Sequence, residues 1–355
     1  MIKSICIVRL SALGDVLMLV PLVRRLQDSL PNVSITWVIS RLAYDLVEGM
    51  DGVEFLVINK PDSIADYWRF YKQMRGRSFD VLLAPQASFR ANLLYPLIKA
   101  KRKIGYDALR AKDGHAWFVR ESIAPGNDHT LDGFLKFADV LDIPESALRW
   151  DLPIAAADYG WAEDHLPKQG PLLLVNPAAS KPERSWLVER YVTIIRYAQH
   201  KWNAQVVLTG GPGAYDRNLA DQILQEADCV DLVGKTKPRQ LLAVISKANL
   251  LLCPDTGPSH MAAAVGTPVI ALHAVTSADV SGPYTFRHLA VDCYPEAVTS
   301  VLNKSASENV WGTHAHGPDT MKLITVEAVI KRLDEVFQSA ALKGSDVSMV
   351  DALTS

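Results

Sequence analysis

Short apolar runs alternate with segments of helical periodicity along most of the chain, and this alternation constrains the fold more than any other feature. In the first half the apolar runs predict strands at residues 4–10, 34–39, 54–58 and 81–84. Helices are expected between and after them, at residues 16–30, 42–50, 63–75, 89–98 and 130–141. Strands that alternate with helices in this way indicate parallel βαβ units, and therefore an α/β fold.

The alternation stops at residues 150–170, a stretch of mixed Pro, Ala, Asp and Gly, and then restarts. The second half predicts strands at residues 172–176, 205–209, 230–233, 250–253 and 269–272, and an amphipathic closing helix at residues 325–341. A chain of 355 residues has room for about two domains. We therefore expect two Rossmann-like domains, residues 1–155 and 156–342, that face each other across a cleft. The closing helix is expected to pack back toward the first domain, and residues 343–355 to form a loose tail.

Charge is nearly balanced, with 37 Lys and Arg against 39 Asp and Glu and a net charge of −2. Because the chain lacks the overall positive charge of a nucleic-acid-binding protein, we expect no nucleic-acid partner. An anionic partner would have to meet a local basic patch. The candidate is the basic stretch at residues 99–120 together with Arg90, which either binds acidic groups of a membrane-borne acceptor or is simply solvated.

The compartment follows from the N-terminus and the cysteines. Met1 leads directly into the first predicted strand without a cleavage motif, and no apolar run reaches the roughly 18 residues of a membrane span. The histidines lack the spacing of metal ligands. We therefore expect a cytoplasmic protein, at most resting on a membrane surface, in which the cysteines are reduced and mostly buried. They are Cys6, Cys229, Cys253 and Cys293.

The loop after the first predicted strand reads Ser-Ala-Leu-Gly-Asp and lacks the G-x-G-x-x-G spacing of a dinucleotide site. Gly14 allows a tight turn, and Asp15 lies at the start of the following helix. A carboxylate in that position is favoured by the helix dipole, so Asp15 either caps the helix or serves as a general base at the mouth of the cleft.

The corresponding loop in the second half contains the most informative motif, Asp-Thr-Gly-Pro-Ser-His at residues 255–260. Thr256 and Gly257 allow close approach of a ligand, and the N–H groups at the start of the next helix can bind a diphosphate. Asp255 beside such a site is expected to hold the loop or to contact a sugar hydroxyl. His260 on its own is better explained as a core or capping residue.

Two further loops follow strands of the second half. Ser180, Lys181 and Arg184 lie after its first strand, where cations can stabilise a departing diphosphate without a metal, although a solvated loop would look the same. A glycine-rich turn at residues 209–213 can accommodate a nucleoside, with Asp216 behind it. Such turns are common, so this second signal is weak.

Taken together, the Gly-Asp pair of the first loop, the 255–260 motif and the Asn-Pro-Ala-Ala-Ser-x-x-x-Arg-x-Trp stretch at residues 176–186 resemble the heptosyltransferases of glycosyltransferase family 9. The resemblance covers about residues 2–340. It implies a GT-B fold, inversion at the anomeric carbon and no bound metal. Residues 273–276, 282–284 and 294–298 are similar to the subgroup that adds the first heptose to Kdo on lipid A.

The resemblance also implies roles for individual residues. Asp15 corresponds to the general base on the acceptor hydroxyl. Arg184 stands where the family commonly has a lysine, so either Arg184 or Lys181 meets the diphosphate. The implied donor-binding residues are Ala179, Ser180, Gly211, Asp216, Asp255, Thr256, Gly257, Ser259 and His260. The implied acceptor-binding residues are Gly14, Arg90 and Arg110.

The function implied is transfer of heptose from ADP-heptose to Kdo of lipid A in the lipopolysaccharide inner core, on the cytoplasmic face of the inner membrane. No cofactor is expected besides the donor substrate. Two alternatives stay open: a non-hydrolysing sugar-nucleotide epimerase of the same fold, and a non-catalytic protein that binds nucleotide sugars. ADP release that depends on an acceptor separates the transferase from both.

Overall fold

The computed structural model describes residues 2–305 and 308–353, with side chains described as far as residue 340. The chain divides into two compact units, Met1–Pro153 and Ile154–Ser355, here called unit 1 and unit 2. The division falls within the Pro- and Gly-containing stretch at residues 150–170. Each unit contains one parallel sheet of six strands, which confirms the predicted α/β class.

The sheet of unit 1 has the strand order β3-β2-β1-β4-β5-β6, and every pairing in it is parallel. The four predicted strands are present, and two more complete the sheet. The strands are β1 (Ser4–Val8), β2 (Ser34–Ser40), β3 (Val53–Ile58), β4 (Phe79–Leu83), β5 (Ala100–Gly105) and β6 (Glu121–Ser122).

Strand β5 lies within the stretch that the sequence suggested as a basic surface. Its Lys-Arg-Lys run conceals the apolar alternation of a strand, because long charged side chains can lay their apolar stems along a sheet. Two of the three cations end on an acid, and Lys103 donates to the Tyr95 carbonyl at 2.7 Å. Lys101 pairs with Asp80 at 2.7 Å, and Arg102 pairs with Glu121 at 2.5 Å. Part of the expected basic face is therefore neutralised inside unit 1.

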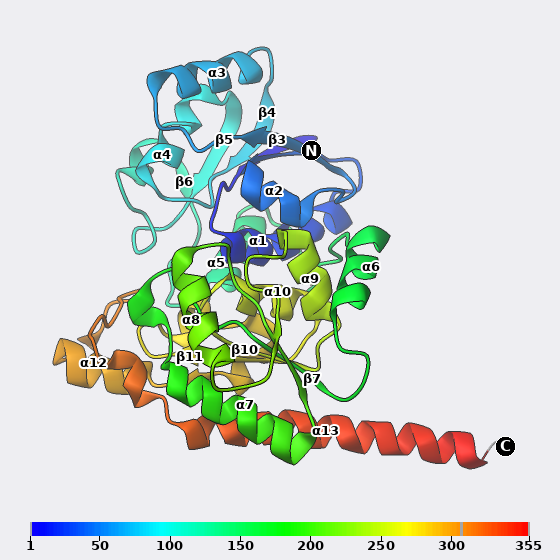
Figure 1. Ribbon diagram of the computed structural model, residues 1–355. Helices are drawn as coiled ribbons and strands as arrows, with labels where there is room; N and C mark the ends of the chain where they lie inside the picture. Colours follow the sequence, from blue (N-terminus) through cyan, green and yellow to red (C-terminus); the bar gives the residue numbers. More distant parts are fainter. Residues whose placement is uncertain (1, 306–307, 354–355) are drawn as a thin grey trace. The chain divides into compact units, whose positions relative to one another are not determined.

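The helices of unit 1 cover this sheet (Figure 1). They are α1 (Leu13–Ser29), α2 (Arg41–Val47), α3 (Ile64–Met74), α4 (Phe89–Asn92) and α5 (Thr130–Asp139), with short 3₁₀ turns η1 (Tyr95–Leu97) and η2 (His115–Trp117). The single helix expected at residues 89–98 is wrong. It is split into α4 and η1 because Pro96 lies in the first turn of η1 and cannot continue a preceding helix.

Unit 2 repeats the same sheet topology. Its order is β12-β11-β10-β7-β8-β9. When these strands are numbered afresh from β7, the order is the same doubly wound order as in unit 1. The strands are β7 (Leu172–Val175), β8 (Gln205–Leu208), β9 (Val230–Asp231), β10 (Leu250–Pro254), β11 (Val269–His273) and β12 (Val291–Asp292). Among the described strands of unit 2, β12 is the one that the sequence analysis did not predict. It is two residues long and leaves no periodicity to detect.

The helices of unit 2 pack on both faces of its sheet and bury a continuous aliphatic core. They are α6 (Ala156–His165), α7 (Val188–Trp202), α8 (Ala214–Leu224), α9 (Pro238–Ser246), α10 (Gly257–Val265), α11 (Ala278–Ser281), α12 (Tyr294–Leu302) and α13 (Val326–Leu353). Three 3₁₀ segments are η3 (Pro182–Arg184), η4 (Tyr284–Leu289) and η6 (Thr320–Leu323).

The closing helix α13 packs against α7 and β11 of its own unit (Figure 1). Val329, Leu333 and Phe337, spaced four residues apart, are buried in the core of unit 2. The sequence analysis expected a loose tail from residue 343, and in the structure α13 continues to Leu353. No proline interrupts these residues.

Three further expectations can be compared with the structure. All four cysteines are free thiols, and Cys6 and Cys253 are buried. Burial raises the pKa of both thiols above the ordinary range. Among the described helices, none combines the length and the apolar character that a membrane crossing requires.

Candidate active site

Strand order decides which loops meet in each unit. β1 and β4 are neighbours, as are β7 and β10, and in both units the order of strands reverses between those two strands. Loops at the carboxyl ends of such a pair diverge to opposite faces of the sheet and leave room for a ligand. The loops after β1, β7 and β10 carry the motifs that the sequence analysis singled out.

The loop after β10 leads into α10 as the sequence predicts. Thr256 is the N-cap residue in extended conformation, and Pro258 lies in the first turn. The Ser259 hydroxyl and backbone N–H both donate to the Thr256 carbonyl, at 2.7 and 3.0 Å, which tightens this turn. Since the first N–H groups of a helix have no partner inside it, the start of α10 can bind an anion near Gly257.

Directly before that turn, Asp255 forms an ion pair with Arg184 of the loop after β7. The guanidinium Nη2 lies 2.5 Å from Asp255 Oδ2 and also donates to the Asp255 main-chain carbonyl at 2.7 Å. Both side chains are mostly buried. The two donor-loop motifs, 71 residues apart in sequence, are therefore joined by one side chain.

Two hydroxyl groups complete the surroundings of the Asp255 carboxylate. Thr276 Oγ1 donates to Oδ2 at 2.5 Å, and Ser281 Oγ donates to the same oxygen at 3.3 Å. Burial alone would raise the pKa of Asp255, but His273 and Arg184 outweigh it and hold this pKa below its ordinary value. Asp255 therefore remains charged and anchors the loop. This anchoring role explains why an acid lies beside an anion-binding site.

The remaining residues of the loop after β7 lie at the surface of the same site. Ala179 is buried and its N–H donates to Ser185 Oγ at 2.9 Å, whereas Ser180 and Lys181 are exposed. Lys181 is the N-cap residue of η3, whose last residue is Arg184. Arg184 and Lys181 are thus on one short turn, but Arg184 is committed to Asp255.

The glycine-rich turn after β8 is closed by an aspartate. Asp216, in the first turn of α8, accepts a hydrogen bond of 2.7 Å from the Gly211 N–H. A Cβ added at Gly210 would lie 3.1 Å from the same carboxylate, so the turn needs a small residue there. Asp216 is accordingly a loop-forming residue in this structure, and it orients the turn in which Gly211 lies.

Two histidines lie near this site, one predicted and one missed by sequence reasoning. His260, a predicted donor-site residue in the first turns of α10, is mostly buried and contributes to the low pKa of Asp255. His314 comes from the loop before η6; its ring centroid lies 5.4 Å from that of His316, whose Nδ1 is 3.6 Å from Glu183 Oε1. Burial and the nearby Arg184 charge lower the pKa of His314. His314 lies in a loop that contains Gly312, Gly317 and Pro318, so no periodic signal marked it.

In unit 1, Asp15 occupies the third position of α1 and closes the turn after β1. Its carboxylate accepts from the Ala12 N–H at 3.1 Å and forms an ion pair with Arg9. Arg9 is buried, donates to the Pro85 carbonyl at 2.5 Å and lies over the Phe134 ring. A carboxylate held by a buried arginine at a switch point is well placed for proton transfer. Arg9 itself was not predicted, because a single arginine at a strand end carries no motif.

The acceptor-side residues differ in their surroundings. Gly14 is buried in the first turn of α1, and Arg90 is exposed on α4. The Arg110 side chain is only 4% exposed and pairs with Asp107 at 2.7 Å and with Asp128 at 3.4 Å. A buried guanidinium with two acidic partners favours a structural role for Arg110, whereas Arg90 remains available to a ligand.

In the part of the chain that the structure describes, no group of three or more His, Cys, Asp or Glu side chains is arranged to hold a metal ion. Lys181, Arg184 and the start of α10 each contribute positive charge to the loops of unit 2.

Comparisons with known proteins agree with this geometry. The family model of glycosyltransferase family 9 (heptosyltransferase) matches residues 67–309, which is more than half of the chain. The chain belongs to this family and is a glycosyltransferase, which confirms the resemblance drawn from the motifs and favours transfer over the epimerase alternative.

Individual relatives extend the match to nearly the whole chain. The lipopolysaccharide core heptosyltransferase OpsX of Haemophilus influenzae is 34% identical over 94% of this chain and 97% of its own. The family 9 glycosyltransferase structure from Veillonella parvula has a TM-score of 0.78 at 20% identity, covering 95% of this chain and 97% of that one. The Escherichia coli heptosyltransferase WaaC, solved with ADP, has a TM-score of 0.71 at 19% identity, covering 94% and 100%. The structural likeness confirms the GT-B type of fold.

Proposed function

We propose that the protein transfers heptose from ADP-heptose to Kdo of lipid A during synthesis of the lipopolysaccharide inner core. The observation that carries the proposal is the Arg184–Asp255 pair at the start of α10, which joins two loops into one anion-binding turn. Family membership supports sugar transfer. The similarity to OpsX, a lipopolysaccharide core enzyme, and to WaaC, solved with ADP, supports the acceptor and donor classes.

Unit 2 binds the donor in this proposal. The N–H groups at the start of α10 and the Lys181 ammonium group meet the diphosphate, while Arg184 holds Asp255 and keeps the turn in place. This division favours Lys181 over Arg184 as the cation that stabilises the leaving ADP. The turn closed by Asp216, which includes Gly211, takes the nucleoside. Because the protein supplies these charges itself, we expect transfer without a metal.

Unit 1 supplies the base. The Asp15 carboxylate removes the proton from the acceptor hydroxyl, the hydroxyl oxygen bonds to C1 of heptose, and the bond from C1 to the phosphate oxygen breaks. The proton ends on Asp15, and the electron pair leaves with ADP. A single displacement of this kind inverts the anomeric centre. Arg90 is the acceptor-side cation, and the reaction takes place on the cytoplasmic face of the inner membrane.

The experiment is incubation of the pure protein with ADP-heptose and Kdo-lipid A, with parallel assays of ADP release and product mass. Transfer predicts one heptose added per ADP released, only when acceptor is present, and the same rate after EDTA treatment. The anomeric configuration of the product, read by NMR, tests inversion. A phosphorylated Kdo acceptor that reacts while Kdo-lipid A does not would correct the acceptor.

Two outcomes would reject the proposal outright. ADP binding without transfer to either acceptor supports a non-catalytic nucleotide-sugar-binding protein. Conversion of the donor to an isomeric sugar nucleotide without ADP release supports the epimerase.

A further inference from the structure

Helix α3 of unit 1 carries an apolar stripe that faces solvent. Ile64, Trp68 and Tyr71 are 89%, 56% and 40% exposed. They recur at intervals of four and three residues, so they lie one above another on a single side of the helix. Large apolar side chains are seldom left exposed in a row, and such a patch marks an interaction surface.

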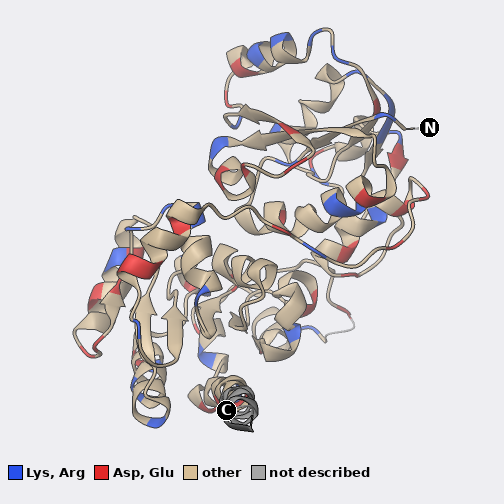
Figure 2. Cartoon of the chain, turned by 90° about the vertical axis from the view of Figure 1, so that its right-hand side faces the viewer, with Lys and Arg blue, Asp and Glu red and all other residues tan. Residues whose placement is uncertain are grey.

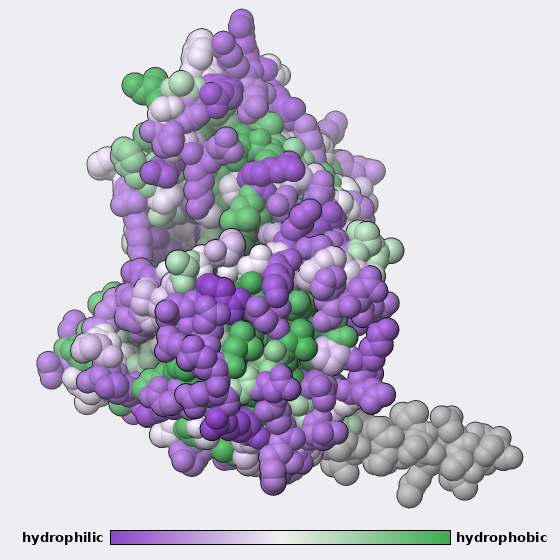
Figure 3. All heavy atoms as spheres, in the orientation of Figure 1, coloured by the Kyte–Doolittle hydropathy of each residue, from purple (hydrophilic) through white to green (hydrophobic). Residues whose placement is uncertain are grey.

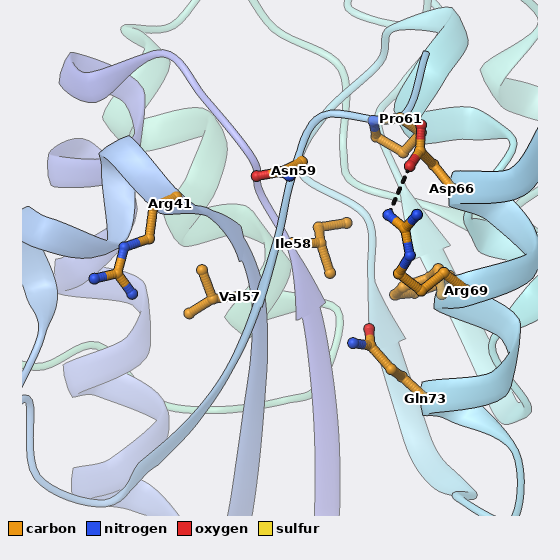
Figure 4. Close-up of a pocket in the computed structure, with 9 residues that line it drawn as sticks. Arg41, Val57, Ile58, Asn59, Pro61, Asp66, Arg69 and Gln73 are labelled. Atoms are coloured by element: carbon orange, nitrogen blue, oxygen red, sulfur yellow. Dashed lines mark hydrogen bonds and ion pairs between the residues drawn. The ribbon is translucent and has the colours of Figure 1, made fainter. Parts of the chain in front are cut away.

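The stripe is a separate face of α3 and not a frayed edge of the core. The helix packs into unit 1 through Phe70 and Met74, which are buried. A third face, with Asp66, Arg69 and Gln73, projects toward a pocket of about 340 Å³ at the end of β3 (Figure 4). Asp66 and Arg69 pair there at 2.8 Å. Ile64, Trp68 and Tyr71 therefore lie on a side of α3 that neither packs into unit 1 nor lines the pocket.

The aromatic rings of the stripe are ordered against one another. The rings of Trp68 and Tyr71 are stacked, with centroids 5.4 Å apart and planes 22° from parallel. The Lys72 ammonium group lies 5.4 Å from the Trp68 ring centroid. The start of the helix is fixed by a capping box between Ser63 and Asp66. The surface is therefore preformed.

Cations border the stripe. Lys72 and Arg75 are exposed at the C-terminal half of α3, and the cationic residues of this helix stand at the top of Figure 2. The Tyr67 hydroxyl donates to the Arg90 carbonyl at 3.2 Å, which places α4 along the flank of α3. There Phe89, 63% exposed, and Arg90 extend the same combination of an apolar and a basic side chain. Apolar atoms also protrude beside α3 at the upper left of Figure 3.

We infer that this surface, formed by Ile64, Trp68, Tyr71, Lys72, Arg75, Phe89 and Arg90, docks unit 1 onto an anionic lipid bilayer. Charge complementarity favours this occupant, because the chain as a whole has a net charge of −2 and would otherwise be repelled. An apolar stripe with Trp and Tyr, bordered by Lys and Arg, is the composition that lies in the headgroup region of a membrane. The inference deepens the proposed function, since it names the surface that would bring the enzyme to a lipid-borne acceptor.

The test is co-sedimentation of the full chain with vesicles that contain neither donor nor acceptor. We expect binding to vesicles of phosphatidylcholine with about a third phosphatidylglycerol, weak binding to phosphatidylcholine alone, and release at about 0.5 M NaCl. The double variants Ile64→Ser with Trp68→Ser, and Lys72→Glu with Arg75→Glu, should each lower the partition coefficient by about tenfold or more. Because the vesicles contain no Kdo-lipid A, the result does not depend on whether the proposed transfer reaction is correct.

Matched controls lie elsewhere on the chain. Val230→Ser with Lys331→Glu changes an exposed apolar residue and an exposed cation of unit 2 and should leave vesicle binding unchanged. Trp117→Ser removes another exposed tryptophan of unit 1 and should also leave it unchanged. Circular dichroism and urea unfolding verify that each variant folds.

Several outcomes would overturn the inference. They are absence of wild-type binding to anionic vesicles, binding by folded α3 variants at the wild-type level, or loss of binding with Trp117→Ser alone. A wild-type dimer in light scattering that the Ile64→Ser, Trp68→Ser variant converts to a monomer would assign the stripe to a second copy of the chain instead.

Discussion

Arg184 donates through one nitrogen, Nη2, to both the carboxylate and the main-chain carbonyl of Asp255, at 2.5 and 2.7 Å. These residues come from loops that follow the adjacent strands β7 and β10. Their pairing follows from strand order, because β7 and β10 are neighbours and the loops after them start side by side at one edge of the sheet.

Breaking this pair should destabilise unit 2. Asp255→Ala leaves a buried arginine without its acid, and we expect a loss of about 3–5 kcal/mol in the free energy of unfolding. Arg184→Met combined with Asp255→Ala should cost less than the sum of the two single changes. Urea unfolding measures all three. Glu163→Ala removes the acid of the exposed Lys247–Glu163 pair and serves as the control, with little change expected. Additive costs would show that the buried pair does not act as a unit.

Asp15→Ala should abolish most of the turnover. A positioned base contributes about 10²–10⁴ to the rate, so kcat should fall by that factor with little change in donor affinity. Acceptor-dependent ADP release measures it. Asp45→Ala, on the surface of α2, should retain full activity. If Asp15→Ala instead weakens donor binding at normal kcat, Asp15 is a binding residue.

Arg9 should act through Asp15. Arg9→Met keeps the volume of the side chain but removes the charge that pairs with the Asp15 carboxylate. The carboxylate then loses one of the two contacts that hold it at the turn, so kcat should fall by about tenfold with the donor KM unchanged. Arg9→Lys should restore part of the activity. A destabilised protein with normal kcat would mean that Arg9 only supports packing.

Substitution of Arg90 should affect acceptor binding, whereas substitution of Arg110 should affect stability. Arg90→Ala should raise the acceptor KM by about tenfold with unchanged stability, because its exposed charge serves binding and does not hold the fold. Arg110→Ala leaves the buried Asp107 without its main partner and should cost about 3–5 kcal/mol of unfolding free energy. Steady-state kinetics and urea unfolding of both variants test this. Equal stability for the two variants would contradict the structural role of Arg110.

His115 should make the stability of unit 1 depend on pH. Burial lowers its pKa from 6.5 to about 4, and the ring accepts from the Tyr106 N–H while facing Asn92 Oδ1 at 2.8 Å. Since the unfolded chain binds the proton more readily, the neutral ring stabilises the fold above about pH 6.5, and this contribution is lost as the pH falls toward 4. The loss can reach about 3 kcal/mol. Urea unfolding between about pH 7.5 and pH 4.5 measures it.

The matched variants for this prediction are both histidine-to-glutamine changes. His115→Gln should flatten the pH dependence, whereas His200→Gln, at an exposed position of α7, should leave it as in the wild type. A slope that survives His115→Gln would assign the effect to another group.

Much of the fold was predictable because its signals are local. Buried parallel strands such as β7 and β10 are continuous apolar runs, and the start of α10 has Thr, Gly and Pro in the order that a helix start requires. The strand β5 was not predictable, since its charged run hides a register that only its partner β4 reveals. Pro96 is visible in the sequence, but whether it interrupts one helix or begins a new turn depends on where α4 ends.

The candidate site likewise contains residues that the sequence identifies and residues that it does not. Asp15, Thr256 and Gly257 were identifiable because each belongs to a strand-to-helix turn with a recognisable motif. Arg9 and Thr276 were not assigned roles, because they act through neighbours that come close only in three dimensions. For the same reason the sequence could not show that Arg184 pairs with Asp255 while Lys181 stays exposed.

The repetition of one sheet topology in units 1 and 2 has a consequence for protein engineering. Each unit contains its own sheet and buries its own core, and the two are joined near Pro153. Under the proposed division of roles, hybrids that join unit 1 of one family member to unit 2 of another would let the choice of sugar nucleotide and the choice of acceptor be inherited separately.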